Sequence, residues 1–394
     1  MAKRLKIAIL MRSSRRCHRD LLCGIAAYAR PHGPWEFYHQ EEPLSDEVPG
    51  WLRNWDGDGI IIRIENRRLF EDVRKLGIPC IDLCGLFIDG GFPSIDSDYA
   101  SVSRLATEHF IEHGFENFAF YGVPDIHYSN NCCRSFTEQI RQSGREVEIF
   151  QCPWELQRVM ANTSEIRGLL RENEMAAWLK ALPKPVGLMA CNDFRAQQVL
   201  DLCLQEGIVV PDEVAVVGIG NDEVLCELSN PPMTSIDVNA WKMGYDAAAL
   251  LESIIRGENP PSQRVLVEPR GIVVRQSSSV LAISDRSVAE AVRFIREHAC
   301  EGIGVEEVLK KVHVSRSTLY RRFNEFLGHS PNTEIRRARL QRIKQFLSET
   351  DYPLVKIAQL VGIAHVENMC NLFKAETGMT ARQYRIEARN GTRI

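Results

Sequence analysis

The sequence of 394 residues lacks the signatures of several large classes of protein. It contains no apolar run long enough to span a membrane, and it does not open with a signal peptide. It also has no G-x-x-x-x-G-K-[ST], G-x-S-x-G or G-x-G-x-x-G pattern, the motifs that bind phosphates or present a nucleophilic serine. We therefore expect a cytoplasmic protein without a cofactor that is not an enzyme.

The C-x-x-C pattern typical of metal-binding and redox-active cysteines is also missing. The chain has twelve cysteines but no C-x-x-C pattern, and neither Cys80 and Cys84 nor Cys132 and Cys133 have metal-binding partners nearby in the sequence. Scattered cysteines in an intracellular chain are usually small buried hydrophobic residues, so we expect neither a metal site nor disulfides. A thiol-based redox sensor stays open as an alternative interpretation of the cysteine excess.

A net charge of −4 argues against DNA binding when it is taken over the whole chain, but the charge is unevenly distributed. Residues 283–394 contain 19 Lys and Arg against 13 Asp and Glu, which gives a net charge of +6. The remaining residues contain 29 basic and 39 acidic side chains, which gives −10. The basic end of the chain is therefore the part that is suited to contact phosphates.

This basic region contains an internal repeat with a period of fifty residues. Leu319–Gly328 aligns with Met369–Gly378, so that Leu319 matches Met369 and Phe323 matches Phe373. In each copy the two apolar residues are four positions apart, on one face of a helix, and the glycine ends that helix. The repeat predicts two copies of one helical unit.

Each copy has a second amphipathic helix upstream. Val305, Val308 and Val312 have helical spacing before a turn at His313 and Val314, after which Ser315 is a favourable N-cap. In the second copy the apolar stripe includes Leu354, Ile357, Ala358 and Val361, and Gly362 makes the turn. Helix, short turn and helix is the arrangement that places its second helix in the major groove of DNA. We expect two such units, at residues 305–327 and 354–376.

The second unit resembles the AraC/XylS family of transcription regulators. The resemblance is carried by Ile357-Ala358, Gly362-Ile363, Met369, Phe373-Lys374, Gly378, Ala381 and Tyr384-Arg385. Ile363, Met369 and Ala381 replace the Phe, Phe and Pro that are usual in the family. The resemblance covers about the last hundred residues and implies an all-α DNA-binding domain, whose first helix we expect to open with a capping box at Ser287-x-x-Glu290.

The first 276 residues alternate between short apolar runs and helical patterns. This alternation, with glycine and proline at the breaks, predicts an α/β fold with parallel sheets, and the length favours two lobes. The predicted strands are Leu5–Leu10, Gly59–Ile62, Cys80–Leu83, Phe118–Tyr121, Gly187–Cys191, Val214–Gly218, Arg264–Glu268 and Gly271–Arg275. The predicted helices follow the first loop at residues 12–19 and then lie at Leu69–Leu76, Ala100–His113, Cys133–Gln142, Ala196–Glu206 and Ala240–Arg256.

This region resembles the effector domain of the LacI/GalR family, which has a periplasmic-binding-protein fold. The motifs occur in order as Asn192-Asp193, Pro211–Gly218 and Pro232–Ile236. The predicted organisation is therefore an effector-binding domain at residues 1–276, a linker at 277–285 that includes the serines after Gln276, and an AraC-type domain at 286–394. In the LacI/GalR family the DNA-binding domain usually comes first, whereas here it follows the effector domain.

Ligands of open α/β sheets bind beyond the carboxyl ends of the strands, and a sugar requires carboxylate, amide and guanidinium partners there. The strand-end candidates are Ser13, Ser14, Arg16, His18, Asp96, Asp98, Arg134, Asn192, Asp193, Asn221 and Asp222. The resemblance implies sugar contacts for Arg134, Asp193 and Asn221. The alternative is that Asp193 caps a helix and that Arg134 is a surface residue.

In the DNA-binding region we expect Leu319, Phe323 and Phe326 to face the core. The candidate base-reading residues of the first unit are Arg316, Ser317, Tyr320 and Arg321, because arginine pairs bidentately with guanine. Phosphate contacts fit Arg322 and the basic residues that follow, Arg336, Arg337, Arg339, Arg342 and Lys344. The second unit offers His365, Val366, Glu367, Asn368 and Asn371.

Together these features predict a sugar-responsive transcription regulator, with activation of a sugar-utilisation operon as the expected role. The two family resemblances imply the partners: double-stranded operator DNA, a small sugar effector (xylose or another pentose), a second copy in a homodimer, and RNA polymerase if the protein is an activator. No membrane partner is expected. An enzyme that acts on a sugar or phosphate between the lobes is the second alternative.

Overall fold

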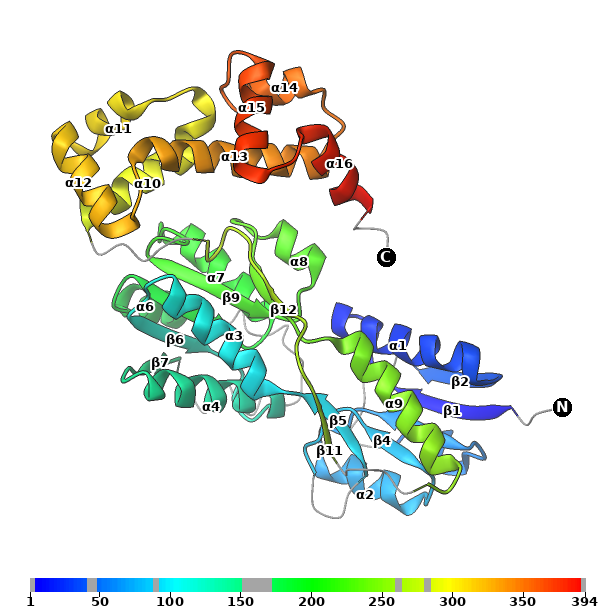
Figure 1. Ribbon diagram of the computed structural model, residues 1–394. Coiled ribbons are helices and arrows are strands. Elements are labelled where there is room, and N and C mark those ends of the chain that lie inside the picture. Colours follow the sequence, from blue (N-terminus) through cyan, green and yellow to red (C-terminus); the bar gives the residue numbers. More distant parts are fainter. Residues whose placement is uncertain are drawn as a thin grey trace. The chain divides into compact units, whose positions relative to one another are not determined.

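The computed structural model divides the chain into two units, residues 1–282 and residues 283–394. It describes residues 4–40, 48–87, 92–150, 172–258, 264–279 and 285–390. The first unit contains two lobes, each built on a mostly parallel sheet, and the second unit is helical (Figure 1). The predicted α/β fold with two lobes, followed by an all-α domain, is confirmed.

Within the described residues, the sheet of the first lobe has the order β11-β5-β4-β3-β1-β2 and is parallel throughout. Alternate side chains of β1 enter different cores: Ile7 and Ile9 pack beneath α1 and α9, whereas Ala8 and Leu10 face the side of α2. The elements of this lobe are β1 (Leu5–Leu10), α1 (Arg16–His32), β2 (Trp35–Gln40), η1 (Leu52–Asn54), β3 (Gly59–Ile62), α2 (Arg67–Lys75), β4 (Cys80–Asp82), β5 (Ser94–Ser97), α9 (Ala240–Ile255) and β11 (Arg264–Val267).

The sheet of the second lobe has the order β12-β10-β9-β8-β6-β7, and its edge strand β12 is antiparallel to β10. Phe118 and Phe120 face α3 and α4 on one side, whereas Leu188 and Val216 face α6 and α7 on the other. The elements of this lobe are α3 (Tyr99–Glu112), β6 (Asn117–Tyr121), α4 (His127–Gln142), β7 (Val147–Ile149), α6 (Glu172–Ala181), β8 (Val186–Ala190), α7 (Asp193–Gln205), β9 (Val214–Ile219), α8 (Glu223–Leu228), β10 (Thr234–Asp237) and β12 (Gly271–Val273).

Across the described residues, the chain passes between the lobes three times: after β5, after β10 and after β11. The crossing segments are hydrogen-bonded to one another. The amide of Asp98 donates to the carbonyl of Val267, and the amide of Arg270 donates to the carbonyl of Asp237, both at 2.9 Å. Several connections of this kind are suited to a hinge between two lobes.

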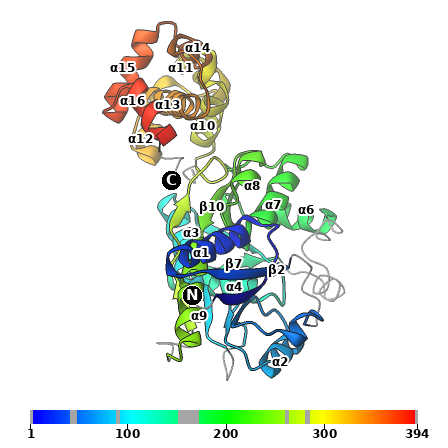
Figure 2. The ribbon, with the colours of Figure 1, turned by 90° about the vertical axis from the view of Figure 1, so that its right-hand side faces the viewer.

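The helical unit gathers around α13, which Figure 1 shows lengthwise and Figure 2 shows after a turn of 90°. It contains two separate apolar cores, one for each copy of the repeat. Its elements are α10 (Arg286–His298), η3 (Ala299–Glu301), α11 (Val305–Val312), α12 (Arg316–Leu327), α13 (Pro331–Glu349), α14 (Leu354–Leu360), α15 (Val366–Thr377) and α16 (Ala381–Asn390).

The fifty-residue repeat is present in the structure. Both bounds of α12 and α15 differ by fifty, and each helix is followed by a glycine in the left-handed conformation, Gly328 and Gly378. The matched apolar side chains Leu319, Met369, Phe323 and Phe373 are all fully buried. The repeat therefore corresponds to two helix-turn-helix units with their own cores.

Three details differ from the sequence-based expectations. The first helix of the second unit is capped by Asp285, whose Oδ1 accepts from the amides of Ser287 and Val288, and not by a capping box at Ser287. Phe326 is 39% exposed, although its helical spacing from Leu319 and Phe323 places it on the same side of the helix. The helix α4 begins at His127, six residues before the predicted start.

The predicted linker at 277–285 also differs in its first residues. Ser277 and Ser278 are fully buried in the first unit. The hydroxyl of Ser277 donates to the carbonyl of Val216, and the hydroxyl of Ser278 donates to Thr234. Since these bonds attach both serines to β9 and β10, they belong to the second lobe. Residues 280–284 of the predicted linker lie outside the described residues.

Candidate functional site

The two lobes of the first unit meet through a set of polar side chains that we call the lobe junction. Its first-lobe members are Arg16, His18, Arg63 and Asp96, and its second-lobe members are His127, Tyr128, Asn192, Asn221, Asp222 and Glu223. All of them lie at or just beyond the carboxyl ends of parallel strands or in the first turn of the helix that follows. This is the edge at which open α/β sheets bind ligands.

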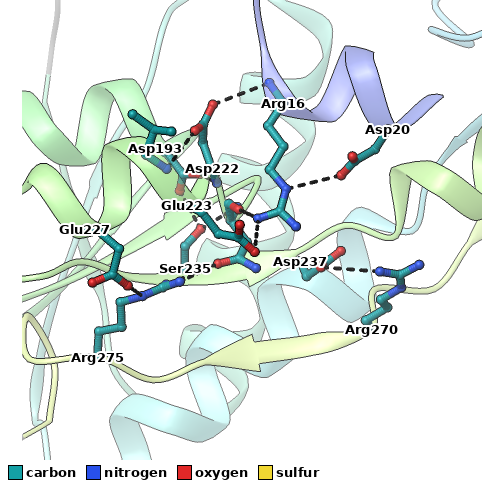
Figure 3. Close-up of polar contacts among 12 residues, drawn as sticks. Arg16, Asp20, Asp193, Asp222, Glu223, Glu227, Ser235, Asp237, Arg270 and Arg275 are labelled. Carbon is teal, nitrogen blue, oxygen red and sulfur yellow. Dashed lines mark hydrogen bonds and ion pairs between the residues drawn. The ribbon is translucent and has the colours of Figure 1, made fainter. Parts of the chain in front are cut away.

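One part of the lobe junction is the loop after β9 (Figure 3). The guanidinium of Arg16 donates to the carbonyl of Asn221 at 2.6 Å and pairs with Glu223 at 2.9 Å. Asn221 has a φ of 49°, a left-handed conformation that asparagine adopts more readily than most residues. Asp222 caps α8 by accepting from the amide of Val224, and it also accepts from the amide of Arg16 at 3.4 Å. The predicted residues Asn221 and Asp222 are therefore in contact with the opposite lobe.

Asp193 lies beneath this loop, where it is 3% exposed. One of its oxygens accepts from the amide of Asp222 at 2.7 Å, and the other accepts from the hydroxyl of Ser235. Burial raises the pKa of the Asp193 carboxyl to about 6. In this arrangement Asp193 supports the loop that carries Asn221 and Asp222.

Asn192 and Tyr128 form a second part of the lobe junction. Asn192 caps α7 through its carbonyl oxygen, which accepts from the amide of Arg195, and its amide nitrogen donates to the hydroxyl of Tyr128 at 2.9 Å. The guanidinium carbon of Arg63 lies 5.9 Å from the centre of the Tyr128 ring, a distance suited to a cation–π contact across the lobes. Arg63 is oriented by Glu65, which accepts from its Nε at 2.8 Å.

His18 faces the same group of side chains from α1. Its side chain is half-buried, and among the described residues its buried Nδ1 has no hydrogen-bond partner. Burial, followed by the nearby charges of Arg63 and Arg15, lowers the pKa of His18 to about 3. The imidazole is therefore neutral at neutral pH and has one ring nitrogen available for a ligand.

Asp96 and Asp98 have different roles although they are two residues apart. Asp98 caps α3: its carboxylate accepts from the amides of Ala100 and Ser101 and from the hydroxyl of Ser101. Asp96 is 2% exposed and contacts His127 of the second lobe at 3.1 Å and Arg264 at 3.2 Å. Asp96 is therefore the member of this pair that reaches across the lobes, whereas the predicted site residue Asp98 acts as a helix cap.

Two other predicted residues lie beside these contacts. The carbonyl of Ser13 accepts from Arg19 at 3.1 Å in the loop after β1. Arg134 is exposed and donates to Asn131, which in turn contacts His127. Arg134 also borders a hollow of about 350 Å³ on the outer face of α4, which is lined by Asn130, Cys133, Arg134, Thr137, Glu138, Arg141 and Ile149. Within the part of the chain that the structure describes, no hydrogen bond or ion pair joins Arg134 to the opposite lobe.

The sequence-based selection missed Arg63, His127 and Tyr128. Arg63 immediately follows the predicted strand Gly59–Ile62, so the strand-end rule could have found it. His127 and Tyr128 were missed because the start of α4 was placed too late. Arg16 and Asp96 were among the strand-end candidates, and the structure brings both into contact with the second lobe.

The second candidate site is the exposed face of α12. Ser315 caps this helix, as predicted, by accepting from the amide of Thr318. Arg316 and Arg321 are exposed, and they form exposed ion pairs with Glu306 at 2.7 Å and Glu325 at 3.2 Å. Such pairs are weak, so both guanidinium groups are available to DNA. Ser317 is exposed and Tyr320 is half-buried, with its hydroxyl accepting from Asn332.

The basic residues after these divide into two groups. Arg337 is exposed, where it is placed to contact a phosphate. Arg322 instead pairs with Asp285 at 3.1 Å, and Arg339 donates to the carbonyls of Ala299 and Ile303 at 2.8 Å. These two residues hold helices together and are less available to DNA than the sequence suggested.

In the second copy, α15 begins after His365. Its predicted reading residues His365, Glu367, Asn368 and Asn371 are exposed, whereas Val366 is half-buried against the second core. This face carries no arginine. The two copies therefore present different chemistry to DNA.

The described cysteines are free thiols, and Cys80, Cys84, Cys132, Cys191, Cys203 and Cys226 are buried. The described part of the chain brings together no group of three His, Cys, Asp or Glu side chains suited to hold a metal ion. Among the described helices, none is long and apolar enough to cross a membrane.

Comparison with known proteins agrees with this architecture. Residues 107–278 match the model of a periplasmic binding protein-like domain, and residues 308–386 match the model of a helix-turn-helix domain. The fold and these two matches define the class: the chain is a transcription regulator in which a periplasmic binding protein-like effector domain precedes an AraC-type DNA-binding domain. The resemblance predicted from the sequence is confirmed.

Within this class, the chain is similar to the xylose operon regulatory protein of Escherichia coli (strain K12), with 28% identity over 399 residues and coverage of 97% of both chains. The protein of the same name from Haemophilus influenzae is 27% identical over 389 residues and covers 97% of this chain and 98% of its own length. A solved structure described as the xylose-binding transcription activator XylR has a TM-score of 0.77, 27% identity and coverage of 98% of both chains. These relatives are transcription regulators.

Proposed function

We propose that this protein activates a sugar-utilisation operon when a small sugar, xylose or another pentose, binds at the lobe junction. The observation that carries the proposal is the set of polar contacts between the lobes, which lies at the strand ends where such folds bind ligands. The xylose-related names of the relatives that match nearly the whole chain support the choice of ligand.

The chemistry of the lobe junction suits a neutral polyol. The guanidinium of Arg63, the amide of Asn192 and the neutral ring of His18 supply donors and one acceptor for sugar hydroxyls. Tyr128 adds an aromatic surface, which sugars contact through their C–H faces. Ser13, Asp98, Arg134, Asp193, Asn221 and Asp222 complete the proposed site, some as direct contacts and some, such as Asp98 and Asp193, as supports of the backbone that carries those contacts.

The proposed mechanism is hinge closure. A sugar that is bound by both lobes favours the closed arrangement, and it shifts the equilibrium only by its difference in affinity for the two arrangements. Operator DNA must then change the affinity for sugar by the same factor by which sugar changes the affinity for DNA.

We further propose a homodimer that pairs through the effector lobes and presents four reading helices to two operator sites, with RNA polymerase as the partner in activation. The two reading helices of one subunit would contact successive major-groove faces about 34 Å apart. Light scattering of the full chain with operator DNA tests this proposal, and a monomer under all conditions would contradict it.

The redox alternative receives little support from the thiols. Burial raises the pKa of both the Cys132 and the Cys133 thiols, so the reactive thiolate is disfavoured at neutral pH. Replacement of both cysteines by serine should therefore leave the DNA response intact.

The sugar proposal is tested by thermal-shift screening of the full chain against pentoses and hexoses, followed by calorimetry. A pentose should raise the melting temperature, and Arg63→Gln should weaken its affinity at least about tenfold, as expected for a lost charged hydrogen bond. Arg134→Ala tests the more distant residue in the same way, and the exposed Arg104→Ala on α3 is the matched control that should bind normally. Absence of a shift with every sugar would contradict the proposal.

A further inference from the structure

Arg275 connects the lobe junction to the end of the first unit. It follows β12, and its side chain is only 13% exposed. Both terminal nitrogens of its guanidinium donate to the side-chain carbonyl of Asn221 at 3.1 Å, and one of them also donates to the carbonyl of Met233 at 3.1 Å. Its Nε donates to Glu227 at 2.8 Å (Figure 3). The planar guanidinium group is thus held on several sides by the second lobe.

The residue that Arg275 holds is also the one that the first lobe contacts. The carbonyl of Asn221 accepts from Arg16, whereas its side chain accepts from Arg275. The amide of Asn221 donates to Ser235 at 2.9 Å, which fixes the third polar group of the residue. A displacement of Arg16 relative to the second lobe therefore acts on the same residue that Arg275 binds.

On its other side, Arg275 directly precedes the last segment of the first unit. The backbone of Arg275 makes two hydrogen bonds with the hydroxyl of Thr234, at 2.8 and 3.0 Å. Ser277 and Ser278 continue the same attachment, since the amide of Thr234 donates to Ser277 and the ring of His109 contacts Ser278 at 2.8 Å. From residue 279 the chain continues toward the second unit.

We propose that Arg275 is a positioning residue that holds Asn221 in the lobe junction and transmits a change in the Arg16 contact to residues 276–279. The inference rests on the proposed function in so far as sugar binding would be the event that changes this contact. Its physical basis is an unbroken series of hydrogen bonds from Arg16 through Asn221 to Arg275, followed by one covalent step into the segment that leads to the DNA-binding unit.

The alternative is that Arg275 only stabilises the second lobe. The two possibilities differ in one measurable respect. If Arg275 only stabilises the lobe, its substitution changes the hydrogen–deuterium exchange of the backbone amides around it. If Arg275 transmits a change, its substitution also determines whether a substitution at Arg16 alters the exchange of residues 276–279. The decisive quantity is therefore whether the effects of substitutions at Arg16 and Arg275 on the exchange of residues 276–279 are non-additive.

The test is hydrogen–deuterium exchange of the full chain, without sugar or DNA, in wild type, Arg16→Gln, Arg275→Lys and the double variant. We expect Arg16→Gln to increase exchange at least about twofold in peptides that contain residues 219–224 and also in those that contain residues 276–279, at the lower end of the coupling between contacting residues. In the Arg275→Lys background, Arg16→Gln should still affect residues 219–224 but no longer residues 276–279, because lysine keeps the charge near Glu227 and cannot bridge two acceptors as a planar fork.

Two further variants complete the design. Arg270→Lys changes an arginine five residues upstream that donates to Asn239 and does not contact Asn221, so the response of residues 276–279 to Arg16→Gln should persist in that background. Asn221→Gly removes only the side chain that Arg275 binds, and glycine tolerates the left-handed φ, so this variant replaces Arg275→Lys if the lysine variant does not fold.

The proposal is overturned if Arg16→Gln leaves residues 276–279 unchanged in the wild-type background, or if their response is the same in wild type, Arg275→Lys and Asn221→Gly. Because no ligand is present, these outcomes do not depend on the identity of the sugar. A protein that binds no pentose but shows the non-additive exchange would refute the proposed function and retain this inference.

Discussion

His127 contacts Asp96 at 3.1 Å, although Asp96 lies on β5 of the first lobe and His127 is the first residue of α4 in the second lobe. Asp96 is 2% exposed and also accepts from the hydroxyl of Tyr99 at 2.6 Å and from Arg264. One buried carboxylate therefore organises side chains from β11, α3 and α4 at the point where the chain crosses between the lobes.

This arrangement predicts a large effect of Asp96→Asn on stability. The substitution removes the carboxylate that pairs with Arg264 at 3.2 Å, and the loss of a hydrogen bond to a charged group costs about 1.5–3 kcal/mol. The free energy of unfolding from urea titration provides the measurement. Asp246→Asn, which breaks the exposed pair with Lys242, is the control and should cost less than about 1 kcal/mol. Equal losses in the two variants would contradict the role of Asp96.

A second prediction concerns pH and Asp193. Its pKa of about 6 in the folded protein lies above the ordinary value of 3.8, so the folded state binds this proton more tightly than the unfolded state. By linkage, ionisation of Asp193 destabilises the fold: the cost is absent below about pH 4, grows as the pH rises to 6 and is constant above. Its full size is on the order of 3 kcal/mol.

The measurement is the difference in unfolding free energy between Asp193→Asn and wild type from pH 4 to pH 7. Other buried groups, such as Asp82, titrate in both proteins and cancel in this difference. The unfolding free energy of Asp193→Asn should increase relative to that of wild type as the pH rises from 4 to 6. A difference that does not change with pH would show that the Asp193 carboxyl titrates normally.

A third prediction separates base reading from phosphate contact. Arg321→Ala should cost about 1–3 kcal/mol of DNA-binding free energy and relax specificity at one position of the operator. Arg337→Ala should weaken binding to all sequences equally and reduce the slope of the logarithm of the binding constant against the logarithm of the salt concentration by about one. Binding titrations with operator variants at several salt concentrations distinguish the two. If Arg321→Ala weakened every sequence equally, its assignment to base reading would be incorrect.

A fourth prediction compares two glycines of the second helix-turn-helix unit. Gly362 has a φ of 67°, and a Cβ there would meet the amide of Gly302 at 2.5 Å and the carbonyl of Cys300 at 2.6 Å. Gly378 has a similar φ of 75°, but a Cβ there would meet open space. Gly378→Ala should therefore cost only the conformational penalty of about 1–2 kcal/mol, whereas Gly362→Ala should cost clearly more.

Thermal unfolding of the full chain, followed through the helical signal, measures both effects. The comparison isolates steric crowding because the two positions share the same backbone conformation. Equal destabilisation by the two substitutions would mean that the turn at Gly362 can move away from Gly302.

Features that depend on local, periodic patterns were predictable from the sequence. The repeat is the clearest case, because Leu319 and Met369, like Phe323 and Phe373, need only helical spacing to be recognised. The strand-end rule likewise selected Arg16 and Asn221, since the position of a side chain after a buried strand already determines which edge of the sheet it occupies.

Features that depend on tertiary context were not predictable in this way. The first turns of α4 contain serine and asparagine, which are poor helix formers, so the helix start and with it His127 and Tyr128 were missed. The strand β5 has the sequence SIDS, whose polar residues are buried because Asp96 finds partners on three other elements. Arg322 and Arg339 carry the same charge as the exposed arginines, and only packing shows that they hold helices together.

The helix α13 fixes the geometry of DNA reading. It runs for 19 residues between the two reading units without interruption, which corresponds to about 28 Å at 1.5 Å per residue. Each residue of a helix adds both length and rotation. One inserted residue would lengthen α13 by only about 1.5 Å, but it would rotate all the residues that follow by about 100° about the helix axis. The helix α15 would then present a different face relative to α12. An inserted residue in α13 would therefore disturb the relation between α12 and α15 through rotation far more than through distance.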